Sequence, residues 1–113
     1  MSSQSPTSRT LAYLKEQGIR AGVTERWNPY ARIRQDLFGF IDLIALYPDG
    51  VCAIQVTSDG GVAARRKKIL TECREAAEDW LSSGGLIEVW GWGKKGPRGA
   101  KKVWTPRVER ISL

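Results

Sequence analysis

Hydrophobic and polar positions recur along the chain with two periods, which separate helices from strands. Between residues 9 and 18, Leu11 and Leu14 share one helical face, and Gly18 is suited to end that helix. Between residues 62 and 84, apolar side chains recur at helical spacing among charged ones, which predicts one long amphipathic helix capped by Gly84. The apolar positions are Val62, Ile69, Cys73, Ala77, and Trp80 or Leu81.

The other apolar segments have the composition and the flanking turns of β-strands. The predicted strands cover residues 23–27, 37–47, 51–58, 86–92 and 102–113. The second and third are joined by a Pro-Asp-Gly turn and form a β-hairpin. The resulting order, α-β-β-β-α-β-β, is typical of an α/β (α+β) protein with a mixed sheet flanked by helices.

Length and composition indicate one folded domain. A chain of 113 residues is large enough for one core, so we expect residues 1–8 to form a flexible tail and residues 9–113 a single domain. No apolar run approaches the roughly 20 residues that a bilayer requires, and the first ten residues lack the apolar segment of a secretory signal. A cytoplasmic protein without membrane contact is expected.

Histidine and cysteine usage excludes several kinds of site. The chain has no histidine, which removes Ser-His-Asp and Cys-His catalysis and His-ligated zinc. Cys52 and Cys73 fit buried small side chains, with one disulfide as the alternative. Any catalysis must therefore depend on carboxylates, amides, hydroxyls, Lys or Arg.

The net charge of +6 lies in the second half of the chain. Residues 1–62 carry six basic and six acidic side chains, whereas residues 63–113 carry twelve and six. This asymmetry favours a polyanionic partner, most simply DNA. The basic residues expected to contact it are Arg65, Arg66, Lys67 and Lys68 near the start of the long helix, and Lys94 and Lys95 in the loop 93–102.

The charge order of the predicted long helix opposes its dipole, since bases come first and acids last. A phosphate bound near the helix start would account for that order. The alternative is a solvated face with an incidental order.

Asp42 interrupts an apolar strand, where a carboxylate is costly unless it is paired or bound to a metal. In the next strand, alternation places Gln55 and Thr57 on a face that apolar side chains do not seal. A register that sets Asp42 opposite Gln55 would assemble oxygen ligands of the kind that Mg²⁺ prefers. Two alternatives remain open: Asp42 at a solvated strand edge, or Asp42 bonded to Arg32 or Arg34.

The segments "GFIDLIAL" and "CAIQVTS" resemble the core of the PD-(D/E)XK nucleases, in particular the archaeal Holliday-junction resolvase and VRR-NUC branches. The resemblance covers about residues 9–92 and implies a restriction-endonuclease-like αβββαβ core. It places Asp42 at the first metal ligand, Gln55 at the second acidic ligand and Thr57 at the position of the lysine.

The resemblance implies a Mg²⁺ or Mn²⁺ site with Asp42 as the central ligand and Gln55 as a neutral second ligand. We expect the Thr57 hydroxyl to orient water and Asp36 to be a possible supplementary carboxylate. Gln55 brings no charge, and Thr57 cannot replace an ammonium. Three nearby features could compensate, each with a plain surface role as its alternative: Asp36 six residues before Asp42, Glu16 on the first helix, and Lys67 or Lys68 on the long helix.

The function expected from these features is a metal-dependent DNA endonuclease that hydrolyses phosphodiester bonds, with branched DNA as the implied substrate. The resemblance also implies a homodimer and a phage or prokaryotic origin. One alternative is a catalytically inactive nuclease fold that binds nucleic acid or serves in an assembly. Another is an adaptor whose basic surface meets an acidic protein.

Overall fold

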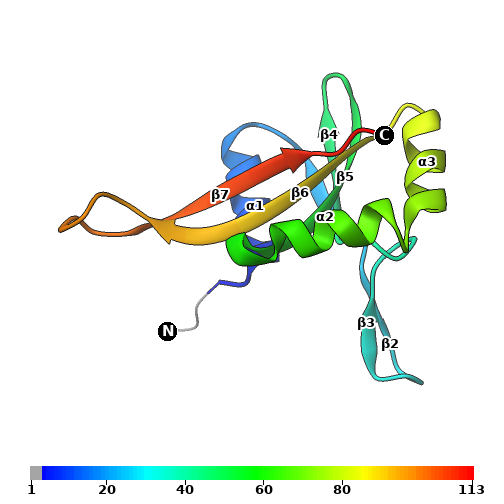
Figure 1. Ribbon diagram of the computed structural model, residues 1–113, viewed down its shortest axis with the longest axis horizontal. Helices are drawn as coiled ribbons and strands as arrows, with labels where there is room; N and C mark the ends of the chain where they lie inside the picture. The colour runs from blue at the N-terminus through cyan, green and yellow to red at the C-terminus, as the bar shows by residue number, and fades with distance from the viewer. Residues whose placement is uncertain (1–3) are drawn as a thin grey trace.

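The computed structural model describes residues 4–113, and a mixed five-stranded sheet forms its centre (Figure 1). The strands lie in the order β1-β4-β5-β6-β7; β5 and β6 are parallel and the other neighbours are antiparallel. Their bounds are β1 Ala21–Val23, β4 Leu43–Tyr47, β5 Gly50–Ser58, β6 Leu86–Lys95 and β7 Val103–Arg110. The predicted α+β architecture with a mixed sheet is confirmed.

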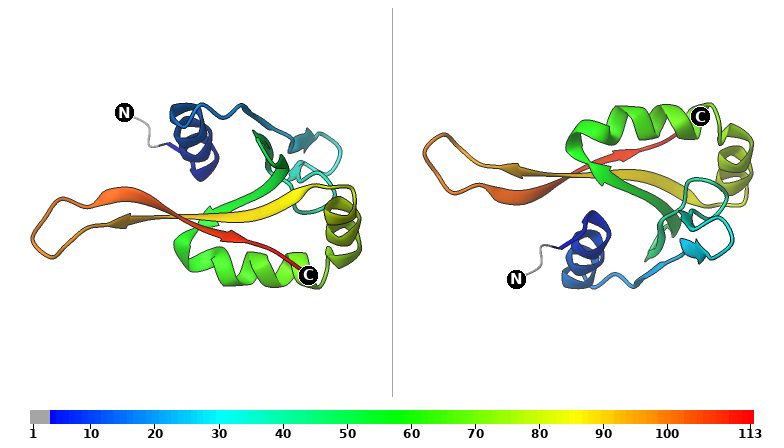
Figure 2. Two further views of the ribbon diagram at one scale, coloured as in Figure 1. Left: turned by 90° about the horizontal axis from the view of Figure 1, so that it is seen from above. Right: turned by 90° about the horizontal axis from the view of Figure 1, so that it is seen from below.

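Helices cover both faces of this sheet (Figure 2). They are α1 Pro6–Glu16 on one face, and α2 Val62–Leu70 and α3 Arg74–Ser82 on the other, with a short 3-10 turn, η1 Asp59–Gly61, before α2. Leu14 of α1 packs in one apolar core with Ile54, while Ile69 of α2 packs in a second core with Ala53. The sheet is therefore the middle of three layers.

Both faces of β5 are buried from residue 52 to residue 56, so the expectation of an unsealed face is wrong at Gln55, whereas Thr57 near the end of the strand is half-buried. Ala53 is fully buried, and Gln55 is only 2% exposed. The prediction fails because β5 is a central strand with helices on each side, where alternation no longer separates core from solvent.

The first helix begins earlier than expected. Ser5 caps it by accepting a hydrogen bond from the Ser8 amide at 3.1 Å, and Pro6 fits the first turn because its missing N–H is not needed there. Residues 6–8 thus belong to α1 instead of the expected tail. The same expectation for residues 1–3 lies outside the described residues.

The predicted long helix is two helices, because the chain turns between Leu70 and Arg74 (Figure 1). The Thr71 hydroxyl donates to the Lys67 carbonyl at 2.7 Å, and the Cys73 amide donates to the Lys68 carbonyl at 3.0 Å. The argument from a reversed helix dipole is therefore wrong. Lys67 and Lys68 lie in the last turn of α2 and Glu75 in the first turn of α3, where each is favoured by its dipole.

The segment before β4 also differs from the prediction. Residues 37–42 form turns instead of strand, with left-handed Phe38 and Gly39 (φ 55° and 85°) reversing the chain. The predicted strand 23–27 is split into the end of β1 and the start of a separate hairpin. That hairpin consists of β2 Arg26–Asn28 and β3 Ile33–Gln35.

Two glycines allow the start of α2 to pack closely on the sheet. A Cβ on Gly91 would lie 2.9 Å from both the Asp59 Cα and the Ser58 carbonyl oxygen. A Cβ on Gly61 would collide with the Thr57 hydroxyl. Glycine is required at Gly91 because backbone atoms leave no space for a methyl group, whereas at Gly61 the Thr57 side chain would have to move.

No helix within residues 4–113 is long and apolar enough to cross a membrane. Cys52 and Cys73 are both free; Cys52 is buried as expected, whereas Cys73 is only half-buried.

Candidate functional site

Asp42 and Gln55 meet at the end of the β4–β5 hairpin, as the predicted register requires. Asp42 lies just before β4, and its amide still donates to the Ile54 carbonyl at 3.0 Å, which continues the ladder. Its Oδ2 accepts hydrogen bonds from Gln55 Nε2 at 2.8 Å and from the Val56 amide at 2.7 Å. Asp42 is 6% exposed, so this carboxylate is held inside the protein by its neighbours on β5.

Two more carboxylates lie beside Asp42. Ligand oxygens of Glu25, Asp36 and Asp42 all lie within 4.8 Å of one another. Asp36 Oδ2 also accepts a hydrogen bond from Gln55 Nε2 at 3.3 Å. The predicted supplementary role of Asp36 thus has the proximity it needs.

Glu25 is a site residue that the sequence analysis missed. The amides of Thr24 and Glu25 both donate to the Asp42 carbonyl, at 2.9 and 3.3 Å, because the pairing of β1 with β4 continues past Val23. The sequence feature that could have indicated Glu25 as a site residue is its acidic side chain at the centre of the predicted strand 23–27. Pairing that strand with the one carrying Asp42 would have placed Glu25 here.

Gln55 contributes an unsatisfied acceptor to the same place. Its amide nitrogen bridges Asp36 and Asp42, whereas its buried Oε1 has no hydrogen-bond partner among the described residues. A buried amide oxygen without a partner is costly and calls for an explanation such as a bound ion.

The electrostatics of Asp42 are those of an uncompensated carboxylate. Burial raises the pKa of Asp42 from 3.8 to about 7, and the adjacent Asp36 carboxyl contributes to the rise. The Val56 amide and the Gln55 amide oppose it by hydrogen bonding to the ionised form. Within the described part of the chain, no Lys or Arg forms an ion pair with Asp42, so the alternative of an Arg32 or Arg34 partner does not hold.

The carboxylates open into a cavity of about 500 Å³, which we call the acidic pocket. Its charged lining is Glu25, Arg34, Asp36, Asp42, Arg65 and Lys68. Lys68 Nζ lies 3.9 Å from Asp36 Oδ2, and Arg34 lies 3.5 Å from Glu25. The carboxylates Glu25 and Asp36 are less exposed than Arg34 and Lys68 beside them, which suits the joint binding of a divalent cation and a phosphate.

The four basic residues of α2 separate into two groups. Arg65 and Lys68 are half-buried and line the acidic pocket, since residues three apart share a helical face. Arg66 and Lys67 are exposed on another side, where Arg66 lies 3.9 Å from Glu109 of β7. The prediction that Lys67 or Lys68 could reach the site is thus resolved in favour of Lys68.

Other predicted residues lie elsewhere. Thr57 is half-buried next to Gly61 at the start of α2 and is not among the residues that line the acidic pocket, so its role in orienting water stays a prediction. Glu16 is exposed at the last turn of α1, about 15 Å along the helix from the Pro6 end that borders the pocket. Lys94 and Lys95 are exposed at the end of β6, on the arm that β6 and β7 extend away from the body (Figure 1).

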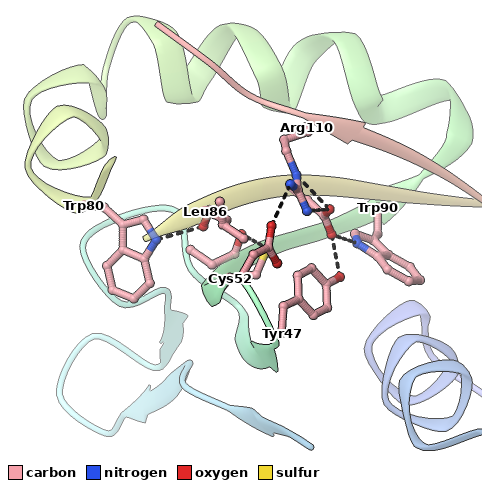
Figure 3. Close-up of polar contacts among 9 residues, drawn as sticks. Tyr47, Cys52, Trp80, Leu86, Trp90 and Arg110 are labelled. Carbon is pink, nitrogen blue, oxygen red and sulfur yellow. Dashed lines mark hydrogen bonds and ion pairs between the residues drawn. The ribbon is translucent and has the colours of Figure 1, made fainter. Parts of the chain in front are cut away.

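A second buried carboxylate, Glu88 of β6, provides a contrast. Glu88 accepts hydrogen bonds from the Tyr47 hydroxyl at 2.6 Å and the Trp90 indole at 3.0 Å, and it pairs with Arg110 at 3.0 Å (Figure 3). Both of its oxygens are satisfied by protein groups, and one partner is a cation. Glu88 therefore joins β4, β6 and β7 structurally, whereas Asp42 lacks such a partner.

No protein-family model matches the chain, and no curated protein is a significant relative of it.

Proposed function

We propose that the protein is a metal-dependent phosphodiesterase that acts on DNA, built on a restriction-endonuclease-like core. The carrying observation is the acidic pocket: three carboxylates with oxygens within 4.8 Å of one another, beside cations and a buried amide oxygen without a partner. A hard divalent cation explains both the clustered like charges and the orphaned oxygen.

The residues present suit Mg²⁺ or Mn²⁺. Asp42, Asp36 and Glu25 offer three carboxylate oxygens, and Gln55 could add Oε1 after rotation of its amide. Such an ion, when bound, polarises a phosphoryl oxygen and lowers the pKa of a coordinated water. The Lys68 ammonium beside Asp36 is positioned to balance negative charge that develops on the phosphate, the role that Thr57 cannot fill.

The arrangement of the core supports the same proposal. Helix α1, the β4–β5 hairpin, the α2–α3 connection and the parallel strand β6 follow one another in the order that the family resemblance implies. The β6–β7 arm adds a basic surface, since its residues Lys94, Lys95, Arg98, Lys101 and Lys102 are all exposed. Contacts from such residues to phosphates would be independent of sequence. The homodimer and the preference for branched DNA stay predictions.

The test is cleavage of linear, nicked and branched DNA with Mg²⁺ or Mn²⁺, together with calorimetric titration of Mn²⁺. Asp42→Asn should abolish cleavage and weaken Mn²⁺ binding at least tenfold. Glu16→Gln removes an exposed carboxylate of α1 away from the pocket and should leave both unchanged. Absence of metal-dependent cleavage of every DNA tested with the unaltered protein would refute the proposal, whether or not Mn²⁺ binds.

A second candidate is a nuclease fold that binds nucleic acid without hydrolysing it. The observation in its favour is that Gln55 Nε2 already donates to both Asp36 and Asp42, occupying the space between them with a neutral donor. Salt-sensitive DNA binding without Mn²⁺ affinity or cleavage would favour this function.

A further inference from the structure

The β2–β3 hairpin, residues 26–35, exposes large apolar side chains without a core of its own; we call it the finger. It projects from the body as a separate two-stranded unit (Figure 1). Trp27 is 56% exposed, Tyr30 97% and Ile33 51%. Exposed apolar side chains gathered on a projection typically mark an interaction site, because they contribute nothing to folding there.

The tip of the finger is ordered by its own hydrogen bonds. Asn28 Oδ1 accepts from the amides of Tyr30 and Ala31 at 3.0 and 3.1 Å, and the Arg32 amide donates to the Asn28 carbonyl at 2.8 Å. These bonds order the backbone that carries Tyr30, so less backbone entropy is lost when a ligand stacks on its exposed ring.

The positive charge of the finger favours a polyanionic ligand. Residues 26–35 include three arginines, Arg26, Arg32 and Arg34, and no acidic residue. Exposed aromatic rings among arginines combine stacking surfaces with phosphate contacts, as in proteins that hold single-stranded nucleic acid.

Both faces of the finger adjoin cavities at the site. Trp27 pairs across the strands with Arg34, so their side chains leave the same face of the ribbon, and Arg34 lines the acidic pocket. On the other face, Arg26 and Gln35 line a second cavity of about 680 Å³, which shares Asp36 with the acidic pocket.

We infer that the finger binds an unpaired strand of nucleic acid, with bases stacked on Trp27 and Tyr30 and the backbone directed by Arg34 toward the acidic pocket. The inference deepens the proposed function and rests on it only for the fate of the bound strand. Duplex DNA cannot use these rings, because its bases are already stacked.

Fluorescence anisotropy with end-labelled oligonucleotides of about 12 nucleotides tests the inference. Single-stranded DNA, single-stranded RNA and blunt duplex are compared in EDTA, so that binding is measured without metal. Trp27→Ala and Tyr30→Ala should each weaken single-strand binding about tenfold and leave duplex binding within twofold. Trp27→Phe and Tyr30→Phe keep a ring and should retain most of the affinity.

The outcomes separate this inference from the proposed function. Unchanged single-strand affinity in both alanine variants, an equal loss of duplex affinity, or a change of oligomeric state in place of affinity would overturn it. If the alanine variants lose single-strand affinity as expected but the unaltered protein shows no metal-dependent cleavage, only the proposed nuclease activity is refuted. Each variant should melt at the temperature of the unaltered protein, because Trp27 and Tyr30 lie outside both cores.

Discussion

The buried Asp42 carboxylate should make the stability of the metal-free protein fall as the pH rises. Its pKa is about 7 in the folded protein, against 3.8 as the ordinary value. Between these values the folded protein binds more protons than the unfolded chain, so the free energy of unfolding decreases with pH across that window. Below about pH 4 and above about pH 7, the contribution of Asp42 to the free energy of unfolding no longer changes with pH.

The magnitude follows from a pKa difference of about three units. At roughly 1.4 kcal/mol per unit, ionised Asp42 destabilises the fold by up to about 4 kcal/mol, which corresponds to a decrease in Tm of about ten degrees or more. Asp42→Asn keeps an acceptor for the Val56 amide without the charge. The variant should be more stable than the unaltered protein at pH 8 and should lose most of the pH dependence.

Thermal unfolding followed by tryptophan fluorescence between pH 5 and pH 8, in EDTA and in Mn²⁺, provides the measurement. At pH 8, Mn²⁺ at a hundredfold excess over its Kd should raise the free energy of unfolding by about 2.7 kcal/mol and so raise the Tm. At pH 5, where Asp42 holds a proton, Mn²⁺ should have little effect on the Tm. Glu16→Gln serves as the matched control. Equal Tm values at pH 5 and pH 8 in EDTA, or an Asp42→Asn variant that is no more stable at pH 8, would refute the reasoning.

Three further predictions concern Lys68, Gln55 and Glu88. Lys68→Ala removes the ammonium beside Asp36 and should lower the cleavage rate, measured by steady-state kinetics, at least tenfold. Lys67→Ala is the control, because Lys67 lies on the exposed side of α2, and should leave the rate unchanged. Gln55→Glu should tighten Mn²⁺ binding about tenfold in calorimetry and lower stability in EDTA, since it adds a buried charge. Glu88→Gln should cost about 2 kcal/mol in urea denaturation, less than for a fully buried pair because Arg110 is 48% exposed, with Mn²⁺ affinity unchanged.

The hairpin and the meeting of Asp42 with Gln55 could be predicted from the sequence because a short turn fixes the register. The Pro-Asp-Gly turn pairs Tyr47 with Gly50, and counting back along both strands sets Asp42 opposite Gln55. Local periodicity was sufficient there, since no distant segment decides which residues face one another.

Glu25 and the division of α2 from α3 depended on contacts that periodicity does not encode. Glu25 reaches Asp42 through the pairing of β1 with β4, which the whole β2–β3 hairpin separates along the chain. The break near Thr71 keeps the apolar spacing on both sides, so the pattern continued through it. Alternation likewise places Thr57 on the same face of β5 as Gln55, but the packing of Gly61 over that face decides what Thr57 contacts.

The close packing at Gly61 and Gly91 has a consequence for mutational scanning. In a library selected only for folded protein, Gly91 should tolerate nothing but glycine and Gly61 should accept few replacements, whereas Glu25, Asp36 and Asp42 should accept neutral replacements freely. A position that rejects substitutions in this screen would therefore be one where a larger side chain does not fit. The three carboxylates should reject substitutions only in a second screen that selects for nucleic-acid cleavage.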